Sequence, residues 1–161
     1  MLVWGTTFPQ TGDNFFKYIG NIVQTFLPYP DFILSARCLD DARLNKQRSE
    51  TKQILNVVAG INSGSGWRHH PAVKMWRGHP RSLALYGLAV CNEHRRRGKK
   101  DRLRPWFRRM ASQLRGSGLP TWVGDERFHA AHRASLLFKN LNWYSRFGWT
   151  EQPNYGYIWP T

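Results

Sequence analysis

Residues 40–58 are the stretch that most restricts how this chain of 161 residues folds. They read DDARLNKQRSETKQILNVV, a run of good helix formers without glycine or proline, which predicts one unbroken helix. Asp40 stands at the N-cap position, and Gly60 lies just past the end. Leu44 and Leu55 mark an apolar side. The segment is therefore expected to be a helix with one side facing a core.

Further helices are expected at residues 72–77, from Pro80 to about residue 97, from Pro105 onward and over residues 125–139. No strand pattern competes with them, because alternation with a period of two is absent over any useful length. The sequence thus predicts an all-α fold, a compact single-domain helical bundle with long loops and an aromatic C-terminal tail.

Residues 1–22 differ in character from the rest of the chain. They contain one aspartate and one lysine as their only charges, and they mix five aromatic residues with glycine and threonine in no clear period. We interpret them as an N-terminal extension and expect the helical domain to span residues 23–161. It would start with an extended segment, since Pro28 and Pro30 exclude an early helix.

The chain is strongly basic, yet it is too apolar to be a disordered tail. It has 24 Lys and Arg against 10 Asp and Glu, a net charge of +14, and 41% of its residues are hydrophobic. A folded polycation favours a polyanion, because neutralised phosphates release condensed counterions, so nucleic acid is the expected partner. No run is long and apolar enough to predict a membrane-spanning helix, and no membrane partner is expected.

Cysteine and histidine usage argues against a metal or disulfide framework. Cys38 and Cys91 are lone cysteines without a CxxC partner, which favours a reduced, intracellular compartment. The six histidines have no acid or cysteine at a ligand-like spacing, so no metal is expected. The N-terminus lacks the features of a secretory signal. We expect a cytoplasmic protein.

Glu50 is the candidate for chemistry, because it is the one acid on a helix face that also carries Arg43, Lys46 and Gln47. A carboxylate there can stabilise positive charge on a sugar as a base departs, or move protons as that sugar opens. The alternative is an ordinary surface pair with Lys46, worth about 0.2–0.5 kcal/mol. No GxSxG elbow or phosphate-binding glycine loop offers another chemistry.

Aromatic residues interleaved with basic ones suit stacking on unpaired bases together with contacts to the phosphate backbone. Arg68, Lys74, Arg77 and Arg133 are expected to hold phosphates. The full set of candidate residues for contact with nucleic acid, DNA if the resemblance described next holds, is Arg43, Lys46, Gln47, Arg48, Trp67, Arg68, His69, His70, Lys74, Trp76, Arg77, His129, His132, Arg133, Trp143, Tyr144 and Arg146.

Several motifs occur in order along the chain: QTFLPYPDF, LDDARLNKQRSE, GWRHHPAVKMWRGHP, LALYGLAVC, LPTWVGDERFHAAHR and WYSRFGWTE. Together they resemble the pyrimidine-dimer DNA glycosylase family, the endonuclease V class, over residues 23–159. The resemblance implies a small all-helical enzyme that cleaves the glycosidic bond of a damaged pyrimidine in double-stranded DNA. It further implies nicking of the abasic strand by β-elimination through an imine, without a cofactor. It implies a bacterial or phage-infected cell, where the protein would be associated with the nucleoid, and we expect a monomer.

The essential carboxylate of that family lies in the first long helix, in a pattern that matches Leu39, Asp41, Leu44 and Glu50. The family's aromatic segment near the C-terminus, expected to sit against DNA around the lesion, matches Trp143, Tyr144 and Gly148. Arg43 and Ser49 stand where better-known relatives have a histidine and an arginine. These departures leave open a preference for another altered or hypermodified pyrimidine.

The family's nucleophile is the α-amino group exposed when the initiator Met is removed, an amine with a pKa of about 8. We hypothesise that translation begins at Val23, which would leave Gln24 or Thr25 first. Met1 or a lysine such as Lys46 is the alternative source of the amine. A non-catalytic nucleic-acid-binding module, which the charge fits equally well, is the competing function.

Overall fold

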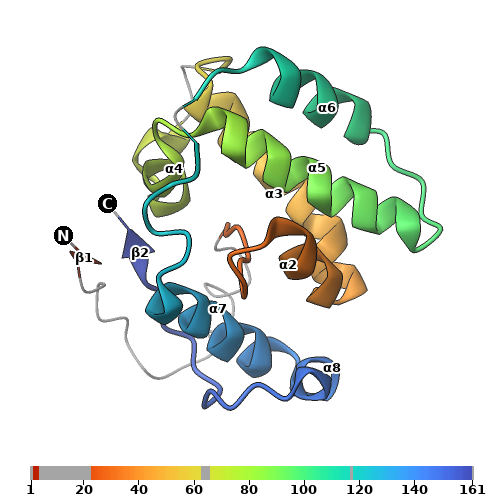
Figure 1. Cartoon of the computed structure of the whole chain (residues 1–161), viewed down its shortest axis with the longest axis vertical. Helices are drawn as coiled ribbons and strands as arrows, with labels where there is room; N and C mark the ends of the chain where they lie inside the picture. The colour runs from red at the N-terminus through yellow and green to blue at the C-terminus, as the bar shows by residue number, and fades with distance from the viewer. Residues whose placement is uncertain (1, 4–22, 63–65, 117, 161) are drawn as a thin grey trace.

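The computed structural model describes residues 2–3, 23–62, 66–116 and 118–160. Its longer helices are α3 (Asp41–Val58), α5 (Pro80–Arg96), α6 (Arg104–Gln113) and α7 (Glu126–Lys139). Shorter helices and turns complete the helical part: α2 (Phe32–Cys38), α4 (Pro71–Trp76), α8 (Leu141–Tyr144) and two 3₁₀ turns, Gly66–His69 and Ser145–Phe147. Two-residue strands, β1 (Leu2–Val3) and β2 (Trp159–Pro160), pair antiparallel. The predicted all-α fold is confirmed (Figure 1).

Capping residues explain where the predicted helices begin. The Asp40 side chain accepts the backbone N–H of Arg43 at 2.8 Å and caps α3. Asp125 caps α7 in the same way. Proline is the first residue of both α4 and α5, where its missing N–H costs no helix hydrogen bond. These starts agree with the sequence prediction to within one residue.

Helix α2 was not predicted, although Asp31 caps it by accepting the N–H of Leu34 at 2.8 Å. It is only seven residues long, and two of its large apolar side chains point outward: Ile33 is 55% exposed and Leu34 48% exposed. An amphipathic pattern is therefore weak in this stretch. The helix owes its place to packing against α5.

Helix α5 is the centre of the bundle and packs against α2, α3 and α6 (Figure 1). Leu83, Tyr86 and Val90 on its inner side are fully buried. Gly87 lets α6 come close, because a Cβ at this position would lie 2.2 Å from the ring of Phe107. The resulting core is continuous from α3 through α5 to α7.

An extended segment, residues 23–28, runs buried between α3 and α5 on one side and α7 on the other (Figure 1). Side chains satisfy its backbone groups in place of a sheet partner. Gln47 Oε1 accepts the N–H of Phe26 at 3.0 Å, and the Tyr86 hydroxyl donates to the Phe26 carbonyl at 2.8 Å. The non-helical start predicted from Pro28 and Pro30 is thus the best-buried loop of the described chain.

Two histidines of α7 hold the same segment at Leu27. His132 Nδ1 accepts the Leu27 N–H at 3.1 Å, which makes its imidazole the neutral form with the proton on Nε2. His129 Nε2 accepts the Gly124 N–H at 2.9 Å, so its Nδ1 donates to the Leu27 carbonyl at 2.7 Å. Both rings are completely buried. The fold therefore needs both imidazoles neutral.

Acidification is expected to weaken the fold through His132. Burial lowers the pKa of this imidazole to about 3, from 6.5. Between these values the unfolded chain binds a proton that the folded chain does not bind, so the free energy of unfolding falls as the pH falls below 6.5. The slope from one such group reaches about 1.4 kcal/mol per pH unit. Urea denaturation at a series of pH values measures it.

His132→Asn is the matched variant, because its amide oxygen can still accept the Leu27 N–H while its side chain does not titrate. Its stability should fall less steeply with acid than that of the wild type. His69→Asn, a change at an exposed position, should keep the wild-type slope. Equal slopes in all three proteins would contradict the assignment to His132.

Candidate active site around Glu50

The Glu50 carboxylate is buried in the middle of α3, only 6% exposed, and three groups surround it. Lys46 Nζ lies 3.3 Å from Oε1, and Gln47 Nε2 donates to Oε2 at 3.0 Å. The backbone N–H of Gln24 donates a third hydrogen bond to the carboxylate. The interpretation of Glu50 as an ordinary exposed surface pair is therefore wrong.

Two opposing effects act on the pKa of the Glu50 carboxyl: burial and the nearby cations. Burial raises the pKa of the carboxyl above its usual value, and this effect outweighs the opposing pull of Lys46, the Gln24 N–H and Lys139. A raised pKa makes the carboxylate a better proton acceptor than an exposed one. The site therefore holds a base with hydrogen-bond donors aimed at it.

Gln24, one of the two residues predicted as the source of the amine, is next to Glu50. Its carbonyl accepts a hydrogen bond from Gln47 Nε2, and its side-chain Oε1 accepts the N–H of Thr25. Its side-chain Nε2 is buried and has no hydrogen-bond partner among the described residues. Thr25 is bound elsewhere, because its Oγ1 accepts from Trp76 Nε1 at 2.9 Å. Of the two, Gln24 is the residue in contact with the carboxylate.

Lys139, the last residue of α7, is a member of this cluster that sequence reasoning missed. Its Nζ lies 4.8 Å from the ring centroid of Tyr155 and 6.0 Å from that of Phe26. Burial, with the nearby charges of Arg43 and Lys46, lowers the pKa of the amine to about 8. No spacing in the sequence links Lys139 to Glu50, since the two lie on different helices.

Six of the predicted DNA-contacting side chains are exposed: Lys46, Arg68, His69, Lys74, Arg77 and Arg146. Five more are half-buried: Arg43, Arg48, Trp67, His70 and Trp143. Two of these are already paired with buried carboxylates: Arg48 with Asp101 at 2.8 Å, and Arg43 with Asp40. For the others, contact with DNA stays a prediction that their exposure permits.

The remaining six predicted contacts are buried and have internal partners: Gln47, Trp76, His129, His132, Arg133 and Tyr144. Arg133 donates to the Pro28 carbonyl at 2.9 Å and pairs with Glu126 and Glu151, which neutralises its charge inside the protein. The others hold the extended segment or the core. The structure therefore corrects the prediction for these residues: their donors are used in the fold rather than presented to phosphates.

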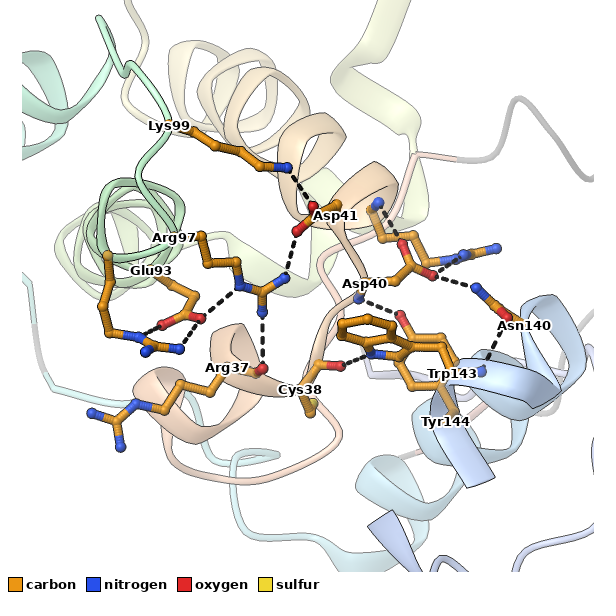
Figure 2. A network of polar contacts seen from close by, with 12 residues as sticks. Arg37, Cys38, Asp40, Asp41, Glu93, Arg97, Lys99, Asn140, Trp143 and Tyr144 are labelled. Atoms are coloured by element: carbon orange, nitrogen blue, oxygen red, sulfur yellow. Dashed lines mark hydrogen bonds and ion pairs between the residues drawn. The ribbon is translucent and has the colours of Figure 1, made fainter. Parts of the chain in front are cut away.

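The aromatic segment near the C-terminus is anchored to the start of α3 (Figure 2). The Tyr144 hydroxyl accepts the Asp40 N–H at 3.1 Å, and Asn140 donates to the Asp40 carboxylate at 3.2 Å. Trp143 Nε1 donates to the Cys38 carbonyl at 2.8 Å. The Trp143 ring also lies 3.9 Å from the guanidinium of Arg146. Trp143 therefore keeps a half-exposed ring beside a cation, whereas Tyr144 is a core residue.

Residues 95–115 contain ten Lys or Arg against one Asp, and part of this charge is neutralised by Asp41 of α3 and Glu93 of α5. Asp41 pairs with Arg97 at 2.9 Å and with Lys99 at 2.6 Å (Figure 2). Glu93 pairs with Arg96 and Arg97. The other exposed cations of the run are Arg95, Lys100, Arg102, Arg108, Arg109 and Arg115. The unpaired positive charge of this run is thus lower than its number of Lys and Arg residues indicates.

Two other kinds of site find no support in the described residues. Among them, no helix has both the length and the apolar character required to cross a membrane. In the same parts of the chain, no three His, Cys, Asp or Glu side chains gather in a way that could hold a metal ion.

This fold and site define a small, basic, all-α protein with a buried carboxylate set among lysines and hydrogen-bond donors. The family model of pyrimidine dimer DNA glycosylase matches residues 23–105, and the chain belongs to that family. The predicted resemblance is confirmed, and it implies glycosylase activity on pyrimidine dimers in DNA. No curated protein and no solved structure matches the chain.

Proposed function

We propose that this protein excises a damaged pyrimidine from double-stranded DNA and then nicks the abasic strand through an imine. The observation that carries the proposal is Glu50, a buried carboxylate whose pKa is raised, with Lys46 Nζ 3.3 Å away and Gln47 Nε2 donating to it. Family membership supports the first step. The second step rests on the chemistry of the cluster.

In the excision step, the base leaves with the electron pair of the glycosidic bond, and the Glu50 carboxylate stabilises the positive charge that develops on the sugar. Water then adds to C1′ and loses a proton, which gives the abasic sugar. The target nucleotide must first leave the base stack, at a cost of a few kcal/mol that damage reduces. Exposed cations such as Lys46, Arg68 and Lys74 hold the phosphates on either side. Trp143, with its half-exposed ring, is suited to stack on a base that has lost its neighbour.

In the nicking step, a neutral amine adds to C1′ of the open sugar and water leaves, which forms an imine. The Glu50 carboxylate then takes a proton from C2′, and the C3′–O bond breaks with its electron pair going to the departing phosphate. In a protein that starts at Gln24, the terminal nitrogen would be the one that now donates to Glu50. That contact supports Gln24 as the amine in such a form.

The test compares three duplexes with the purified protein: one with a single cyclobutane pyrimidine dimer, one with a single abasic site, and one undamaged. We expect base release and strand cleavage on the first, cleavage on the second and neither on the third. Salt-dependent binding to all three without cleavage would instead indicate a non-catalytic nucleic-acid-binding module. Cleavage of the abasic duplex alone would indicate a different modified pyrimidine as the substrate.

A further inference from the structure

We propose that Lys139 is a catalytic amine of this protein, the group that forms the imine with C1′ of an abasic sugar in the full chain. The inference rests on the proposed nicking function and assigns its nucleophile. It arises from the position of the Lys139 side chain at the end of α7: Nζ lies 6.0 Å from the ring centroid of Phe26, whose N–H is held by Gln47, the residue that donates to Glu50.

The surroundings of Lys139 disfavour its charged form. The side chain is half-buried between the rings of Tyr155 and Phe26, and it forms no salt bridge with any described carboxylate. Arg43 and Lys46 of α3 repel its positive charge, while Glu50 is the acid that opposes them. With a pKa of about 8, roughly a quarter of the amines are neutral at about pH 7.5, against about one in a thousand for an ordinary lysine.

The other nitrogens near Glu50 are less suited to this step. The Gln24 nitrogen is joined to Val23 by a peptide bond in the full chain, and an amide lone pair is delocalised into its carbonyl. Lys46 is 52% exposed, and its ammonium is paired with Glu50 at 3.3 Å. Lys139 is therefore the half-buried lysine near this cluster that forms no ion pair with a described carboxylate.

The step balances without any further reactant. The neutral Lys139 amine attacks the C1′ aldehyde, a C–N bond forms, and the aldehyde oxygen leaves as water with two protons, one from the nitrogen and one from solvent. The resulting cationic imine acidifies C2′, so Glu50 takes the C2′ proton while the C3′–O bond breaks and phosphate leaves with the electron pair. Water then hydrolyses the imine and restores the amine. Borohydride intercepts it by adding hydride to C1′, which leaves a stable secondary amine.

The experiment uses the full chain, a duplex with one abasic site and borohydride, and it maps the adduct by digestion and mass spectrometry. We expect the modified residue to be Lys139. Lys139→Arg keeps the positive charge but removes the nucleophile, so the adduct yield should fall by about 10²-fold or more. Lys52→Arg is the control, because Lys52 also faces an aromatic ring, that of Trp106 at 5.3 Å, and should trap like the wild type. Circular dichroism checks that each variant is folded.

Two outcomes would overturn the assignment while leaving the nicking function intact: wild-type trapping by Lys139→Arg, or an adduct mapped to Met1 or Lys46. Absence of any adduct on the wild-type protein would overturn both Lys139 and the imine step. Base release from a pyrimidine-dimer duplex, measured in parallel, shows whether glycosylase activity stands in that case. Each failure is thus separable from the others.

Discussion

Glu50→Gln is expected to reduce base release and strand cleavage by about 10²–10⁴-fold while leaving DNA affinity within a few-fold of the wild type. Glutamine has the same shape, and its amide oxygen can still accept the hydrogen bonds from Gln47 and the Gln24 N–H. It carries no negative charge that could stabilise a cationic sugar, and it cannot accept the proton from C2′. Binding is driven by cations elsewhere, so it should persist.

Single-turnover excision on a dimer duplex measures the first effect, and fluorescence anisotropy on the same duplex measures the second. Asp41→Asn is the matched control: it also removes one carboxylate from α3, but at a position 57% exposed and paired with Arg97 and Lys99. Its excision rate should stay near the wild-type value. Parallel loss of excision, binding and stability in Glu50→Gln would contradict a catalytic role and indicate a structural one.

Trp76→Ala is expected to lower the free energy of unfolding by about 3–5 kcal/mol, the largest stability effect foreseen for one side chain. The indole is fully buried, with its ring 5.0 Å from that of Trp122 in an edge-on arrangement. Its Nε1 also donates to Thr25 Oγ1 at 2.9 Å, which anchors the extended segment next to Gln24. Truncation therefore leaves a cavity and an unsatisfied hydroxyl together.

Trp76→Phe separates the two contributions, because it keeps most of the ring and loses the hydrogen bond. We expect it to cost much less than Trp76→Ala, with about 1 kcal/mol from the lost hydrogen bond. Urea denaturation followed by far-UV circular dichroism compares the three proteins. A cost for Trp76→Ala below about 1 kcal/mol would show that the site relaxes around the cavity and that Trp76 does not hold the core together.

Glu50 and the extended segment show how far local patterns reach. The motif match included both of them, whereas composition by itself favoured an ordinary surface ion pair between Glu50 and Lys46. What changes that interpretation is burial, which comes from α3 packing its middle turns against residues 23–28 and α5. Burial of a side chain depends on what covers it, and a helix pattern shows only which side is available to be covered.

The prediction that the two histidines of α7 contact phosphate is wrong, and the reason is informative. His129 and His132 lie near Arg133 and were expected to face phosphate, yet all three turn inward to bind Leu27 and Pro28. A buried stretch without a sheet partner needs polar side chains to satisfy its backbone, and no sequence signal marks which helix supplies them. Lys139 is the opposite case, an ordinary lysine in the sequence that packing half-buries against Phe26 of the extended segment and Tyr155.

The all-α class, the starts of α3, α5 and α7 and the basic character follow from the sequence alone, and its motifs identify the family. These properties depend on short-range effects: a capping aspartate, a proline at the first turn, an apolar side and a sum of charges. Which polar groups face inward, by contrast, depends on how the helices pack. Contacts between residues about a hundred positions apart, such as Leu27 with His132, are set by the packing of whole helices, and no local pattern encodes them.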